Sequence, residues 1–126
     1  MEEKKRIESF EDLDVYQKLV KLHLEINELS LKFPKFELYE LGSQIRRSSN
    51  SAPANLSEGW SNKHINIYLE GINRAQSEVQ ETKHHLYVSF KKSYLKEDEY
   101  LGYKVRYEEC GKMLKGLERS LESKSL

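Results

Sequence analysis

The chain has few cysteines and no long apolar run, the features typical of proteins of an oxidising compartment or a membrane. It contains one cysteine, Cys110, in 126 residues, so no internal disulfide can form. No apolar run approaches the roughly 20 residues that a membrane-spanning helix needs. The charges at positions 1–6 are not followed by the apolar stretch of a secretory signal. These absences predict a cytoplasmic protein that does not enter a membrane.

An excess of charge of one sign is also lacking. Lysine plus arginine number 21, aspartate plus glutamate number 21, and the formal net charge is +0. Proteins that bind nucleic acid mainly through charge carry an excess of basic residues, although a neutral total can still conceal a basic face. The charge balance therefore argues against a strongly basic nucleic-acid binder and indicates no particular partner.

Proline and glycine are scarce, and strand-like alternation is hard to find. Two prolines and six glycines punctuate the chain, which predicts long helices with short connections. The length suffices for one domain that closes its own core. We therefore expect residues 1–126 to form a single domain with an ordered core at about residues 10–122.

Apolar residues recur at helical spacing in four segments. The first segment ends at Pro34, the second runs from Glu37 or Leu38 to Ser57 with Gly59 just past its end, the third covers about residues 65–94, and the fourth begins near Glu97. The seam of the first is Val15, Leu19, Leu22, Ile26, Leu29 and Phe33. The face of the third is Ile65, Tyr68, Leu69, Ile72, Ala75, Val79, Leu86, Tyr87, Phe90 and Tyr94. The seam of the fourth is Tyr103, Tyr107, Cys110, Leu114, Leu117 and Leu121. Four such helices predict an all-α, antiparallel up-down-up-down four-helix bundle.

The second segment carries a polar stripe beside its apolar face. At about 100° per residue, one arc gathers Leu38, Leu41, Ile45, Ser49, Ala52 and Leu56. The adjoining arc, called the polar stripe below, gathers Gln44, Arg47, Ser48, Ser51, Asn55 and Glu58, and leaves Arg46, Asn50 and Ser57 to solvent. Pro53 falls inside this helix, where it removes a hydrogen bond. One interpretation is a kinked, closely packed helix with no further role, and the other is a shaped polar surface whose charged ends bind partners elsewhere.

Signals of enzyme chemistry are weak. Glu81 and His84 form one Glu-x-x-His step, whereas a di-metal bundle needs two such steps and two more glutamates. Cys110 falls on a core seam, where a thiol usually serves packing. There is no glycine-rich phosphate loop and no nucleophile elbow. We expect no catalysis, no cofactor, no metal and no small-molecule substrate.

The second helix also resembles a known family. The residues that carry the resemblance are Gln44-x-Arg46-Arg47-Ser48-x-x-Ser51-x-Pro53-Ala54-Asn55-x-x-Glu58-Gly59, with further likeness in Phe10-x-x-Leu13-x-Val15-Tyr16-x-Lys18, Glu81-Thr82-Lys83-x-His85-Leu86 and Gly111-Lys112-Met113-Leu114-x-Gly116-Leu117. The chain is similar to the bacterial four-helix-bundle proteins first noticed in intervening sequences of large-subunit ribosomal RNA genes. The resemblance implies a homopentamer arranged as a ring around a central channel, and it carries the family's acidic position onto Glu81.

Two functions remain open. A relative of that family, the accessory variability protein of diversity-generating retroelements, is similar in fold and binds a reverse transcriptase and nucleic acid through a basic surface, and this chain departs from it in having no net charge. The first hypothesis is RNA binding through a composite basic surface of Arg46, Arg47, Lys63, His64, Lys91 and Lys92. The second is a structural scaffold that docks a protein partner, with the polar stripe, Pro53 and Glu81 sealing contacts within or between subunits.

Overall fold

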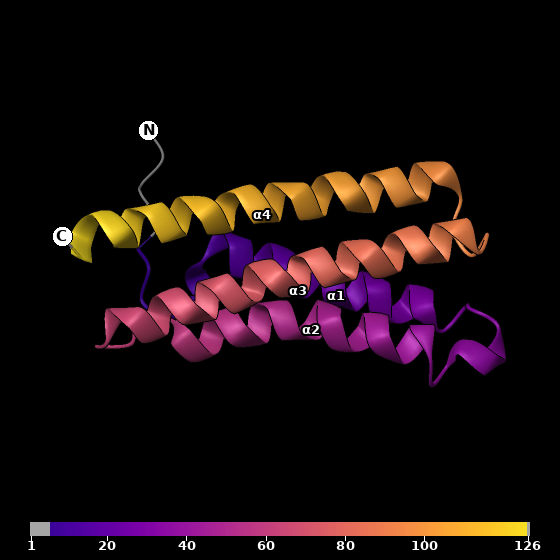
Figure 1. Cartoon of the computed structure of the whole chain (residues 1–126), viewed down its shortest axis with the longest axis horizontal. Coiled ribbons are helices and arrows are strands. Elements are labelled where there is room, and N and C mark those ends of the chain that lie inside the picture. The colour runs from indigo at the N-terminus through magenta and orange to yellow at the C-terminus, as the bar shows by residue number, and fades with distance from the viewer. Residues whose placement is uncertain (1–5, 126) are drawn as a thin grey trace.

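Four long helices make up the computed structural model, which describes residues 6–125, Ser125 by its backbone alone (Figure 1). The helices are α1 (Asp14–Ser30), α2 (Leu41–Gly59), α3 (Ile65–Lys91) and α4 (Glu97–Ser125), and short 3-10 turns η1 (Phe10–Asp12) and η2 (Lys35–Glu37) precede α1 and α2. No strand occurs between residues 6 and 125. The predicted all-α class with four helices is confirmed.

The core follows the apolar seams. Val15, Leu19, Leu22 and Ile26 of α1 are buried at the spacing of four and three residues that the sequence shows. They join the buried hydrophobic residues of the other helices, which are Leu41, Ile45, Ala52, Leu56, Ile72, Ala75, Val79, Leu86, Tyr107, Cys110 and Leu114. Each of α1 and α3 packs against both α2 and α4, and Figure 1 shows α2 and α3 side by side along their lengths.

The connection between α1 and α2 differs from the prediction. α1 ends at Ser30 rather than at Pro34, because the chain tightens there into turns in which the amide of Phe33 donates to the carbonyl of Ser30. Phe33 is buried all the same. η2 occupies the predicted start of the second helix, so α2 begins at Leu41, and Leu38 is exposed instead of facing the core.

Glu37 explains this difference. Its side chain is only 1 % exposed. Its Oε2 accepts hydrogen bonds of 2.8 Å from Lys92 Nζ and from Tyr94 Oη. A carboxylate held by the end of α3 and the turn after it fixes η2 with Glu37 turned inward and Leu38 turned outward.

Two further expectations need correction. Gly59 is the last residue of α2 and has no positive φ; the left-handed conformation falls instead on Ser61, with φ of 55°. The need for glycine at position 59 comes from packing, described below. Tyr87, predicted on the core face of α3, is exposed, and its ring meets the edge of Tyr100 on α4.

Candidate functional site

The inner part of the polar stripe lies in the contact between α2 and α3. Ser48 is fully buried, and its Oγ lies 2.8 Å from Oγ1 of Thr82 on α3, which is also 2.8 Å from the carbonyl oxygen of Glu78. These hydroxyls satisfy one another inside the bundle. Ser48 is thus a helix-to-helix contact.

Arg47 connects α2 to two carboxylates of α3. Its Nη1 lies 3.5 Å from Oε2 of Glu78, and its Nη2 donates to Oε2 of Glu81. The Arg47 side chain is 58 % exposed, whereas that of Glu78 is 19 % exposed. The charged end of the stripe therefore has its partners on the neighbouring helix, and Glu81 is one of them.

His85 adjoins these charges one turn further along α3. Its Nε2 lies 4.0 Å from Oε2 of Glu81. Burial lowers the pKa of His85 below its usual value, and the nearby Glu81 carboxylate opposes this shift without cancelling it. We call Arg47, Glu78, Glu81 and His85 the charge cluster.

Pro53 lies in a continuous helix. α2 runs through it from Leu41 to Gly59, and Pro53 itself is buried. Asn55 Nδ2 donates to the main-chain carbonyl of Ser51 at 2.8 Å, so this stripe residue serves the backbone near the proline.

The two helices approach each other closely at a pair of glycines. A Cβ placed on Gly71 would lie 2.8 Å from the carbonyl oxygen of Asn55 and 3.1 Å from Cα of Gly59. A Cβ on Gly59 would lie 2.9 Å from the carbonyl oxygen of Ile67. Because these neighbours are backbone atoms, neither position has room for a side chain.

The other stripe residues and Arg46 lie differently from the prediction. Gln44 and Glu58 are exposed in the single chain rather than half hidden. Arg46, expected to face solvent, is partly buried: its Nη1 donates to Ser30 Oγ at 2.9 Å and its Nη2 to the carbonyl of Leu38 at 2.6 Å. Because α1 ends at Ser30, Arg46 can bond both to this last residue of α1 and to Leu38, and it thereby holds the loop between α1 and α2.

The six residues of the predicted basic surface are not brought together. Arg46, Arg47 and Lys92 are engaged within the chain, as described above. Lys63, His64 and Lys91 are exposed and make no side-chain ion pair among residues 6–125. Lys63 and His64 precede α3 while Lys91 ends it, which separates them by roughly 40 Å at about 1.5 Å per helical residue.

Several contacts of this site were missed by sequence reasoning. Glu78, Thr82 and His85 recur at spacings of four and three on the face of α3 that meets α2, and this polar spacing opposite Arg47 was a usable signal. Glu37 gave no such signal, because its partners Lys92 and Tyr94 lie 55 and 57 residues away in sequence. Hydrogen bonds from Lys92 and Tyr94 hold the pKa of Glu37 below its usual range.

Residues suited to metal or nucleophilic chemistry do not converge. Within the described part of the chain, no group of three His, Cys, Asp or Glu side chains is placed to hold a metal ion. Burial raises the pKa of the Cys110 thiol to about 11, so at neutral pH it is a protonated core group. No helix between residues 6 and 125 is long and apolar enough to cross a membrane.

These features define a small helical-bundle protein with a polar, charge-linked seam between its second and third helices. Residues 11–116 match the family described as 23S rRNA-intervening sequence protein. The chain belongs to this family, as the motif in the second helix predicts. A comparison with curated protein sequences gives no match.

Proposed function

We propose that this chain is a non-catalytic, antiparallel up-down-up-down bundle that assembles with copies of itself into a ring and acts as a scaffold for a protein partner. The contacts of Ser48 with Thr82 and of Gly59 with Gly71 support the opposite run of α2 and α3. The family resemblance supports a ring of five, and the single, buried cysteine supports a cytoplasmic location.

The observation that carries the proposal is apolar surface on ordered elements. Leu101 and Val105, one helical turn apart on α4, are both exposed, Val105 by 62 %. Phe36 and Tyr39 are exposed in the loop that Glu37 and Arg46 hold in place, Tyr39 by 87 %. Large apolar side chains gathered on rigid surface are typical of protein interfaces.

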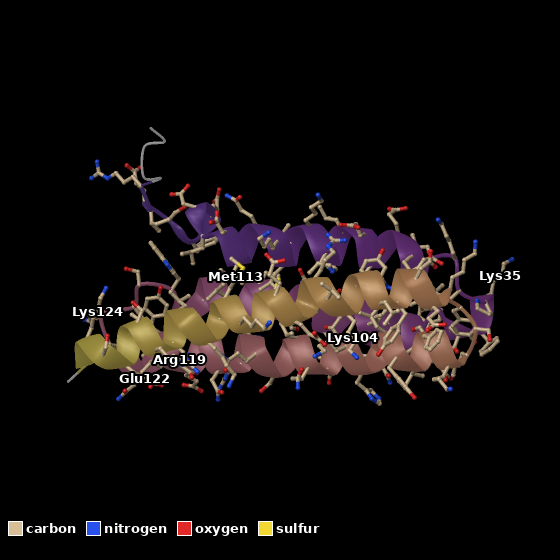
Figure 2. The ribbon with its side chains drawn as sticks, turned by 90° about the horizontal axis from the view of Figure 1, so that it is seen from above. Lys35, Lys104, Met113, Arg119, Glu122 and Lys124 are labelled. Atoms are coloured by element: carbon tan, nitrogen blue, oxygen red, sulfur yellow. The ribbon has the colours of Figure 1, made fainter. Side chains whose placement is uncertain are left out.

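Charge supports the same proposal. The chain is neutral overall, and α4 carries side chains of both signs, among them Lys104, Arg119, Glu122 and Lys124 (Figure 2). Half of the predicted phosphate-binding groups are already paired inside the chain. A protein partner suits such a surface better than a polyanion does.

The experiment introduces negative charge at Leu101 and Val105, the exposed apolar residues of α4. We expect the double variant Leu101→Glu and Val105→Glu to keep its helical circular dichroism, because both side chains are exposed, and to lose self-association in light scattering. The matched control, Ser120→Glu with Ser123→Glu, adds two charges to exposed positions of the same helix and should assemble normally. If the double variant and the control had the same mass in solution, Leu101 and Val105 would not take part in self-association.

RNA binding is the second candidate, favoured by Lys63, His64 and Lys91, which are exposed and make no side-chain ion pair within the described chain, and by the ribosomal RNA in the family's description. In a ring these groups would be repeated, so that weak phosphate contacts add up. Binding of single-stranded RNA should then weaken steeply with salt, and Lys63→Gln with Lys91→Gln should flatten that slope. Absence of binding even at low salt would eliminate this candidate.

A further inference from the structure

A groove of about 500 Å³ runs between α3 and α4, away from the α2–α3 contact. The two helices lie side by side in both Figure 1 and Figure 2. The groove residues used below are Gln76 and Lys83 of α3 and Tyr107, Glu108, Lys112 and Lys115 of α4. Its volume lies within the range of small-molecule sites, about 300–1,000 Å³.

The groove is basic in a chain that is neutral overall. Three lysines and one glutamate line it. Lys83 Nζ lies 3.7 Å from Oε1 of Glu108, so the one carboxylate already has a cation beside it. Lys112 and Lys115, three residues apart on one side of α4, make no ion pair within the described chain. Two uncompensated ammonium groups thus border the groove.

Two buried polar atoms of the groove residues also lack partners. Gln76 Nε2 and Tyr107 Oη are buried beside the groove that their residues line, and they have no hydrogen bond among residues 6–125. Tyr107 is 0 % exposed. Burial raises the pKa of its hydroxyl, which therefore keeps its proton and remains a donor. Unpaired buried donors lower stability, so such groups usually indicate a missing acceptor.

We propose that this groove binds a small organic oxyanion, a phosphorylated or carboxylated molecule of mononucleotide size. Its anionic group lies against Lys112 and Lys115, and its body accepts hydrogen bonds from Gln76 and Tyr107. The groove shares no residue with the exposed apolar surfaces or the predicted basic surface, so the site stands or falls independently of the proposed function.

The test uses pyrophosphate and citrate as probes, each compared with sodium chloride at equal ionic strength. We expect a saturable shift of the Gln76 side-chain amide in NMR spectra and a higher melting temperature. A response to pyrophosphate alone would identify a phosphorylated ligand, and a response to citrate alone a carboxylated one. Lys112→Gln with Lys115→Gln should weaken binding at least tenfold, whereas the control pair Lys32→Gln with Lys35→Gln, in the exposed loop before α2, should not.

A second variant separates ligand binding from folding. Gln76→Leu removes the unpaired amide at similar volume, so it should raise the melting temperature of the free protein and weaken anion binding. Binding that is unchanged in this variant, or in the Lys112 and Lys115 pair, would overturn the proposal. The proposal would also be overturned if the NMR signal of the Gln76 side-chain amide shifted no more with either anion than with chloride. A shift that occurs with RNA alone would overturn it as well.

Discussion

Arg47 is the residue on which the charge cluster depends, because it serves Glu78 and Glu81 at once. Glu78 has little contact with water, and apart from Arg47 its buried Oε2 has no partner among the described residues. Removing the guanidinium would leave this carboxylate unpaired, which costs about 1–3 kcal/mol for a buried group. The cost should be near the lower limit, since Arg47 itself is more than half exposed.

We therefore expect Arg47→Ala to lower the free energy of unfolding by about 1 kcal/mol in urea denaturation. The control is Arg74→Ala, which breaks the exposed pair of Arg74 with Glu70 on α3 and should change stability by less than about 0.5 kcal/mol. Equal effects of the two substitutions would show that the charge cluster adds nothing beyond an ordinary surface ion pair.

Two histidines give the fold a pH dependence. Burial lowers the pKa of both His23 and His85. Nδ1 of His23 forms a 2.8 Å hydrogen bond with Ser49 Oγ. The unfolded chain takes up these protons at about pH 6.5, and the folded chain takes them up only at lower pH. The two histidines therefore do not lower the free energy of unfolding above about pH 6.5. This free energy falls as pH drops from there through the folded-state pKa values.

The measurement is the free energy of unfolding at pH 7.5 and pH 5.5. We predict a loss of stability at the lower pH that is reduced in the double variant His23→Gln and His85→Gln. His64→Gln, at an exposed position before α3, should retain the loss. The explanation fails if the double variant loses as much stability as the unaltered protein.

At the scale of elements, the contact between α2 and α3 requires glycine where α4 does not. A methyl group on Gly71 would meet the backbone of Asn55 and Gly59, whereas one on Gly102 would have no heavy atom within 4 Å. Overpacking a close contact costs about 1–3 kcal/mol. Alanine at an open helical position is instead favourable by roughly 0.5–1 kcal/mol.

Gly71→Ala should therefore lower the melting temperature, and Gly102→Ala should raise it. Both substitutions add the same methyl group to a helix, so the difference between them isolates the helix contact. Thermal unfolding followed by circular dichroism gives both values. A stabilising Gly71→Ala would mean that α2 and α3 separate readily at this point.

The sequence predicts the elements better than their ends. The buried spacing of Leu19, Leu22 and Ile26 is local information, and the helix it predicts is present. The early end of α1 and the late start of α2 depend on Glu37, whose partners come from the far end of α3 and the turn after it. Local periodicity carries no trace of such a contact.

The candidate site follows the same pattern. That Arg47 needs a partner follows from its place on α2, and the family resemblance points to Glu81. The spacing of Glu78 and Thr82 indicates a polar face on α3, but which of its residues meet α2 depends on the register of the two helices, which one sequence does not contain.

At the scale of the whole molecule, the chain combines zero net charge with exposed apolar side chains, among them those in the loop before α2 and Leu101 and Val105 of α4. Neutral proteins with uncovered apolar surface tend to associate. An assembly of several copies would cover such side chains, and zero net charge would leave little repulsion between the copies.

The most direct test is the solution mass of the unaltered protein, measured by light scattering over a hundredfold range of concentration and at low and high salt. We predict one closed species, five times the 14.9 kDa chain mass, that persists at high salt because apolar contacts hold it. A 14.9 kDa monomer throughout that range would contradict the proposed assembly.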